Sequence, residues 1–270
     1  WHKIMKVLLV LLVSLVCISS IPLIHAEDRF NTMRVIHKDN PTVCIMEPIE
    51  ELQVRYHSHL LQIAFDSVME WQTDMYNFTD GDWYMPMRLY DHEDHFDKDV
   101  RDFPECDIFI EYADINPGDV VNSSALAYTS FDFSRSVHQY SYVKIYVQAE
   151  KIGSNITFCL GCNEGLAKAD ITSKKSQEYL DQATIRKIML HEIGHALGLG
   201  HYIEDKDKSN NESSIMYPYL KAFGDNSGAE IEFVDKIMMR EMYHKDGFGG
   251  HAGFTPKYFE INSLLKDFYA

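Results

Sequence analysis

The stretch HEIGHALGLGH, residues 191–201, combines three histidines and a glutamate with apolar residues and glycines. On a helix, His191 and His195 are four residues apart, so both imidazoles leave the same face, one turn above the other. Gly198 follows three residues later, where a residue without Cβ can take a left-handed conformation and end the helix. That turn can bring His201 back toward the same point. The spacing therefore predicts three imidazoles that converge on one metal ion.

Three neutral imidazoles leave a fourth coordination position for water on Zn²⁺, which is typical of a catalytic site and not of a structural one. Glu192 stands next to the first ligand, where it can accept a proton from water activated by the metal and pass it to a leaving amine. The alternative is a buried helix with histidines and no metal. The added spacing of Gly198 and His201 makes that alternative rare by chance. The residues thus predict metal-assisted hydrolysis with one catalytic Zn²⁺ as cofactor, and they leave open whether the bond is a peptide or another amide.

The pattern H-E-x-x-H-x-x-G-x-x-H resembles the zinc signature of the metzincin metalloproteases. Downstream, SIMYPY resembles their methionine turn, and Met216-Tyr217-Pro218 is most similar to the matrixin branch. The resemblance implies a zinc endopeptidase in which Met216 is a hydrophobic floor beneath the zinc. It also implies that Met216, Tyr217, Pro218 and Tyr219 form the pocket wall beside the cleft. Pro218 stands where other branches carry a tyrosine ligand, so we do not expect Tyr217 or Tyr219 to bind zinc.

The same resemblance implies an α+β, metzincin-like fold. Its upper lobe, about 41–198, would hold a twisted, mostly parallel sheet with an antiparallel edge strand and two long helices. Its small lower lobe, about 199–270, would hold the methionine turn and a C-terminal helix. Helical spacing of apolar residues predicts the two long helices at 50–77 and 176–197. A capping box at 227–230 predicts the start of the final helix.

Apolar or alternating runs predict strands at 41–46, 83–90, 106–112 and 140–148. Pro86 places the second of these strands at an edge or a bulge. The segment SALAYTS falls where metzincins place the edge strand that pairs with an extended substrate. Its candidate substrate-binding residues are Ala125, Leu126, Ala127 and Tyr128. An ordinary loop or a covered strand is the open alternative for this segment.

The first 26 residues contain two lysines, a long apolar run and an end at Ala26 that fits a cleavage site, which predicts a secretory signal peptide. An uncleaved membrane anchor is the alternative, because the run approaches the length needed to span a bilayer. Residues 27–270 would then form a single metalloprotease catalytic domain. We expect the protein to be secreted or extracellular, or else anchored in a membrane and facing outside.

The four cysteines after residue 26 are an even number in an exported chain, which favours disulfides over free thiols. We prefer the pairs Cys44 with Cys106 and Cys159 with Cys162. Redox activity or metal binding by the C-x-x-C pair stays open.

The chain of 270 residues carries a formal net charge of -16, which excludes nucleic acid as a partner. Its carboxylates make Ca²⁺ a candidate second ion, although no calcium motif is present and the acidic segment 91–99 lacks the required glycine and spacing. The expected partner is a peptide or protein substrate of a monomeric enzyme. The rival interpretation is a cell-surface binding protein with a metzincin-like fold and a non-catalytic zinc.

Overall fold

The computed structural model describes residues 29–30, 40–79, 83–95, 102–114, 126–132, 140–151, 157–159, 176–203, 214–221 and 230–243. The predicted signal segment, Ala125, Cys162 and Ser227 lie outside these residues. Among the helices within them, none has the length and apolar character that a membrane span requires.

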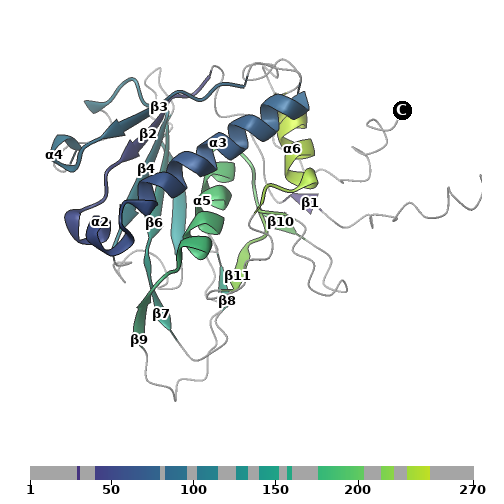
Figure 1. Ribbon diagram of the computed structural model, residues 1–270. Helices are drawn as coiled ribbons and strands as arrows, with labels where there is room; N and C mark the ends of the chain where they lie inside the picture. The colour runs from purple at the N-terminus through teal and green to yellow at the C-terminus, as the bar shows by residue number, and fades with distance from the viewer. Residues whose placement is uncertain are drawn as a thin grey trace, which may run out of the picture.

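A five-stranded sheet forms the centre of the described structure (Figure 1). Its order from edge to edge is β3 (Met87–Tyr90), β2 (Val43–Met46), β4 (Ile108–Ala113), β6 (Tyr140–Tyr146) and β5 (Ala127–Asp132). All neighbours pair in parallel except β5, which runs antiparallel to β6. The predicted mostly parallel sheet with an antiparallel edge strand is thus confirmed. Strand β3 begins directly after Pro86 and lies at the other edge, where a residue without a backbone donor is tolerated.

The alternation of side chains along the strands divides the buried residues between the two faces of the sheet. Val43 and Ile45 of β2 belong to the main core, together with the helices. Cys44 lies on the opposite face in a second cluster with Phe109 and with Cys106. There the predicted disulfide between Cys44 and Cys106 is present, with 5.7 Å between the Cα atoms. It ties β2 to the residues that lead into β4.

The predicted helix at 50–77 is two helices, α2 (Glu50–Tyr56) and α3 (His59–Thr79). His57 and Ser58 between them have φ values of 49° and 66°, a left-handed conformation that a continuous helix cannot contain. The apolar spacing does not reveal the break, because the buried face of α3 continues the same pattern. His57 is exposed.

The prediction of a zinc helix at 176–197 is wrong in its first turns. Residues Ser176–Tyr179 form strand β9, which pairs antiparallel with β7 (Gln148–Lys151). The helix, α5, covers Gln182–Ala196. Asp181 begins it, because its Oδ1 accepts a hydrogen bond of 2.7 Å from the backbone N–H of Thr184. The helical spacing of apolar residues predicts a helix at 176–180, but this segment pairs with a strand distant in the sequence. The helix starts only after its N-cap at Asp181.

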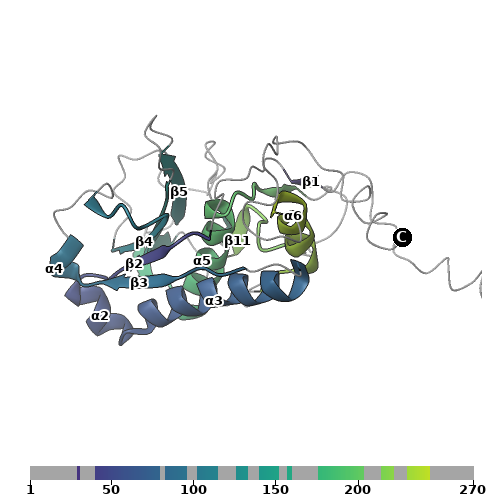
Figure 2. The same cartoon turned by 90° about the horizontal axis from the view of Figure 1, so that it is seen from above.

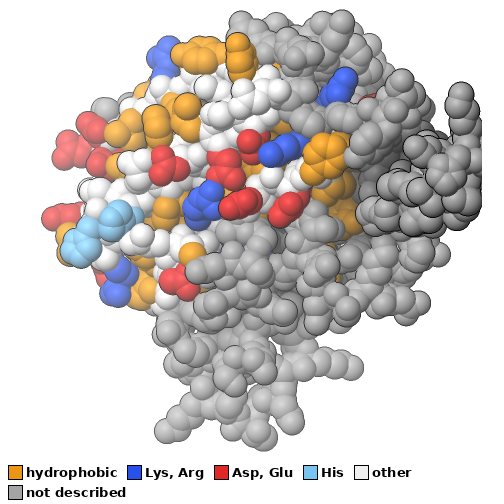
Figure 3. Space-filling model, turned by 45° about the vertical axis from the view of Figure 1, so that its right-hand side comes forward, with side chains coloured by type: hydrophobic (Ala, Val, Ile, Leu, Met, Phe, Trp, Pro, Cys, Tyr) orange, Lys and Arg blue, Asp and Glu red, His pale blue; other side chains and the backbone are white. Residues whose placement is uncertain are grey.

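Helices α3 and α5 lie against each other on one face of the sheet, as Figures 1 and 2 show. Trp71 of α3 is fully buried and donates from its indole N–H to the carbonyl of Leu190 in α5, at 3.0 Å. An ion pair between Arg186 and Glu70 also joins the two helices. Acidic and basic side chains lie close together on the face shown in Figure 3.

The C-terminal helix, α6, covers Phe233–Tyr243 and packs on α3. It begins three residues after Glu230, so the predicted capping box at 227–230 does not start it. The side chain of Asp235 instead reaches back to the N–H of Glu232, at 3.0 Å. The remaining described elements are short: β1 (Arg29–Phe30) with β10 (Tyr202–Ile203), β8 (Thr157–Cys159) with β11 (Tyr219–Lys221), and α4 (His92–His95).

Candidate metal centre and active site

The end of α5 brings the third histidine back toward the first two. The N–H of Leu197 still bonds to Ile193, at 2.9 Å, and Gly198 then takes a φ of 108°. A side chain at that φ would be strained, which is why glycine is required there. The chain reverses, and His201 arrives beside His195.

The ligand nitrogens of His191, His195 and His201 lie within 4.8 Å of one another. The Nε2 atoms of His195 and His201 are 3.2 Å apart. Two nitrogens on a tetrahedral zinc, each at about 2.0–2.1 Å from the ion, would lie about 3.3 Å apart. The His195–His201 pair matches this spacing, and all three ligand nitrogens lie close enough together to hold a metal ion.

Two of these rings are held by backbone carbonyls through the nitrogen that faces away from the cluster. The Nδ1 of His191 donates to the carbonyl of Ile215 and the Nδ1 of His195 to that of Leu199, each at 2.7 Å. A carbonyl only accepts, so Nδ1 carries the proton and the neutral ring keeps a lone pair on Nε2. The Nε2 of His191 is buried and has no hydrogen-bond partner among the described residues. Such an arrangement is typical of imidazoles that bind metal.

Burial keeps the imidazoles of His191 and His195 neutral in the metal-free protein. It lowers the pKa of His191 well below its ordinary value, with the neighbouring histidines adding to the effect. It lowers the pKa of His195 to about 4, against a smaller opposite effect of the bond to Leu199. Neutral imidazole is the form that a metal ion binds.

Glu192 belongs to the zinc helix α5 and is 1% exposed, and its side chain contacts the edge strand β5. The Thr129 hydroxyl of β5 donates to its Oε2 at 2.6 Å. Its Oε1 is buried and has no partner in the described part of the chain. Burial raises the pKa of Glu192 to about 7, and the bond from Thr129 opposes this rise. A carboxyl group of this kind can exchange a proton near neutral pH.

The predicted floor residue, Met216, is fully buried against α5. A Cβ added at Gly194 would lie 2.4 Å from its Sδ and 3.2 Å from Cζ2 of Trp71. The zinc helix can approach the methionine turn this closely only because Gly194 has no side chain. The adjacent carbonyl of Ile215 then reaches the ring of His191.

Asp235 holds the methionine turn in place from α6. Its carboxylate is 0% exposed and accepts from the hydroxyl of Ser214 at 2.5 Å and from the N–H of Ile215 at 3.0 Å. Burial raises its pKa to about 7, and these donors oppose the rise. The sequence interpretation did not include Asp235, although an acid at the third position of a helix is a local cue for capping.

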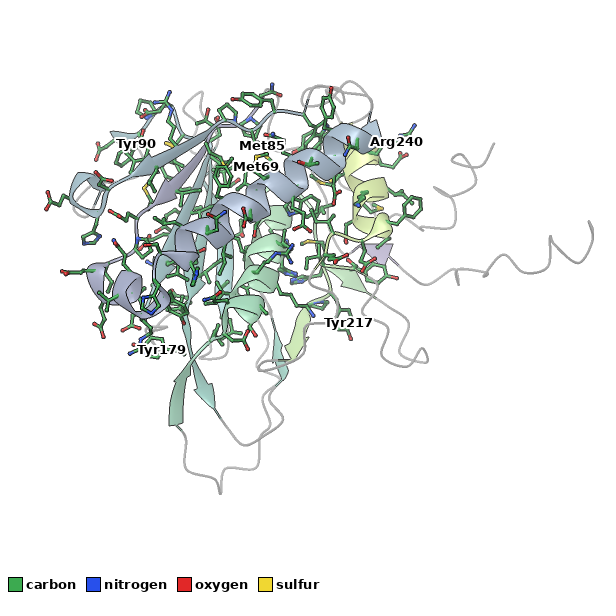
Figure 4. The ribbon with its side chains drawn as sticks, viewed as in Figure 1. Met69, Met85, Tyr90, Tyr179, Tyr217 and Arg240 are labelled. Carbon is green, nitrogen blue, oxygen red and sulfur yellow. A yellow bond between two sulfur atoms is a disulfide. The ribbon has the colours of Figure 1, made fainter. Side chains whose placement is uncertain are left out.

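The other predicted wall and cleft residues are only partly placed. Tyr217 is half-buried and lies near β10 and β11 in Figure 4, and Pro218 is buried. Tyr219 begins β11 and pairs with Cys159 of β8. Leu126 and Ala127 are buried at the start of β5, where the backbone of Tyr128 pairs with β6.

Comparison with known families accounts for this arrangement of helices, histidines and methionine turn. The model of the matrixin family matches residues 59–244. The chain belongs to the matrixin family. The match begins at α3 and includes the triad, the methionine turn and α6, so the metzincin-like fold applies to this matrixin. Family membership and the histidine triad together support a metalloprotease that uses zinc.

A protein of Trichoplusia ni ascovirus 2c, described as a candidate matrix metalloproteinase, is 37% identical over 92 residues. The aligned region covers 30% of this chain and 17% of the viral protein. The chain thus spans about a sixth of that relative.

Proposed function

We propose that this matrixin is a secreted zinc-dependent endopeptidase. The observation that carries the proposal is the pair of buried atoms at the centre of the site, the Nε2 of His191 and the Oε1 of Glu192. The Nε2 of His191 has a lone pair that a metal ion can bind, and the Oε1 of Glu192 can accept a proton. A site with a purely structural zinc would not require the second.

In this mechanism His191, His195 and His201 hold the zinc ion. When bound, zinc polarises the scissile carbonyl and lowers the pKa of water to about 7. Glu192 accepts the proton of the attacking water at Oε1 and passes it to the leaving amine nitrogen. Burial supports the role of Glu192 as proton acceptor, because in the metal-free protein it raises the pKa of this carboxyl above its ordinary value.

The substrate we propose is an extended peptide that adds to the outer edge of β5 by backbone pairing. Ala125, Leu126, Ala127 and Tyr128 would then lie along the cleft, with Met216 to Tyr219 as the opposite wall. Secretion is supported by the apolar N-terminal run and by the disulfide between Cys44 and Cys106, which is typical of oxidising compartments.

The substitution Glu192→Ala tests the proposal. We expect the variant to lose cleavage of a general peptide library while its zinc content stays near that of the wild type, since Glu192 is not a ligand. A chelator should abolish wild-type cleavage and added zinc should restore it. Cleavage that survives in Glu192→Ala would refute the role of Glu192. An absence of chelator-sensitive cleavage in the zinc-loaded wild type would instead favour the binding-protein interpretation.

A further inference from the structure

We propose that Thr129 is a positioning residue that orients the Glu192 carboxylate through its hydroxyl, so that Oε1 faces the attacking water. The inference rests on the proposed endopeptidase function. It starts from one contact, in which the Thr129 hydroxyl lies 2.6 Å from Oε2 of Glu192 and 3.0 Å from its backbone carbonyl.

The hydroxyl has one proton, so only one of these two acceptors can receive a full hydrogen bond. The carboxylate is nearer, and when ionised it is the stronger acceptor. We therefore infer that the Thr129 hydroxyl donates its hydrogen bond to Oε2. With Oε2 engaged, the terminal torsion of Glu192 is restrained and Oε1 remains the atom that can accept from water. A free carboxylate would rotate broadly about that torsion.

The strand keeps the Thr129 hydroxyl in place. Thr129 lies in the middle of β5, opposite Val143 of β6 in the antiparallel ladder. A β-branched side chain in a strand has few accessible rotamers. Ser141 of β6 anchors the same helix nearby, because its buried hydroxyl donates to the carbonyl of Ala196 at 3.1 Å. The helix that carries Glu192 is therefore fixed to the sheet even without Thr129.

This arrangement links the proton acceptor to the strand proposed to bind substrate. A peptide that pairs with β5 would be positioned by the same backbone that holds Thr129. The distance between the scissile bond and Oε1 would then depend on one rigid strand. No local pattern in the sequence marks Thr129, which is 63 residues from Glu192.

The experiment compares Thr129→Val, Thr129→Ser and Ser141→Ala in the full zinc-loaded chain. Valine keeps the shape and removes the hydroxyl, whereas serine keeps the hydroxyl. We expect kcat of Thr129→Val to fall about 10- to 100-fold with KM within about twofold of wild type, because misorientation of a catalytic group costs rate and not binding. Thr129→Ser should recover most of the lost kcat. Ser141→Ala, which removes a hydroxyl-to-carbonyl bond from the same helix, should keep wild-type kcat.

A second readout does not depend on activity. Crystal structures of the zinc-loaded wild type and Thr129→Val should show one orientation of the Glu192 carboxylate in the first and a rotated or split one in the second. Thr129→Ala replaces valine if that variant does not fold. If the wild type cleaves no peptide, the endopeptidase function fails, and the crystal structures alone decide the positioning role. Unchanged kcat or an unchanged carboxylate in the variant, or a failure of serine to restore kcat, overturns it.

Discussion

At the scale of residues, the candidate site depends on side chains that use one polar atom for the protein and keep another for chemistry. His191 and His195 donate from Nδ1 to backbone carbonyls. Glu192 accepts at Oε2 from Thr129. Each side chain is thereby fixed in orientation, and its second polar atom points into the site. The loss of any of these hydrogen bonds should reduce activity more than it lowers the free energy of unfolding.

Burial of His195 gives a prediction about pH. Because its pKa is lowered to about 4, the unfolded chain takes up this proton before the folded chain does. The contribution of His195 to stability is therefore full above pH 6.5 and is lost as the pH falls toward 4. Since His195 is only partly buried, solvent screening reduces the effect, and we expect a loss of about 1–3 kcal/mol.

The measurement is urea unfolding of metal-free wild type and His195→Asn between pH 7 and pH 4. The unfolding free energy of the wild type relative to the variant should decline over this range. Both proteins keep Glu192 and Asp235, whose raised pKa values act in the opposite direction, so those effects cancel in the difference. Parallel pH profiles of the two proteins would contradict the prediction.

At the scale of elements, the site lies where three segments meet: the zinc helix α5, the methionine turn and the edge strand β5. Gly194 lets the turn approach the helix, and Asp235 of α6 holds the turn from the other side. The position of His191 depends on this assembly, because its ring bonds to the turn at Ile215. Helix α6 is thus part of the support of the metal centre.

The substitution Asp235→Asn tests this support. An amide carries an NH2 group in place of one carboxylate oxygen. That group would face donors that now meet only oxygen, and we expect the free energy of unfolding to fall by about 2–4 kcal/mol. Zinc affinity should fall as well, because the turn carries the carbonyl that orients His191. Chemical denaturation and zinc titration measure the two effects.

Asp74→Asn is the matched control. Asp74 pairs with Lys236 of α6 at 3.1 Å, but this ion pair is partly exposed. Its loss should cost less than about 1 kcal/mol and leave zinc affinity unchanged. Equal losses in the two variants would argue against a specific role of Asp235.

At the scale of the whole molecule, residues far apart in the sequence are brought together by packing on both faces of one sheet. The helices cover one face, and the cluster around Phe103, Phe109 and the disulfide covers part of the other. The disulfide joins cysteines 62 residues apart and encloses α2, α3 and β3 in its loop. It therefore restrains a large part of the unfolded chain.

Replacing Cys44 and Cys106 together by alanine should lower the free energy of unfolding by about 4 kcal/mol, the loop-closure value for this separation. Thermal and denaturant unfolding of the variant and the oxidised wild type measure the difference. The cysteines lie on the face of the sheet opposite α5, so we expect zinc binding by the folded variant to remain. Reduction of the wild type should reproduce most of the loss. A stability unchanged by reduction would contradict the loop-closure account.

The sequence by itself determined the features that depend on local spacing. Residues four apart on a helix share a face, so the placement of His191 and His195 followed from their positions alone. The alternating strands, the edge position after Pro86 and the preferred pairing of Cys44 with Cys106 were likewise predictable. The similarity to the matrixins was carried by two short motifs, and the family match confirms it.

Only the tertiary structure decided where elements begin and which distant side chains meet. The break at His57 and the start of α5 after Asp181 depend on backbone conformations and pairings that apolar spacing does not encode. The contacts of Thr129 with Glu192 and of Asp235 with the methionine turn join residues 63 and about 20 positions apart. Local periodicity arises from the repeat of the backbone itself, whereas such contacts arise only when separate elements pack together.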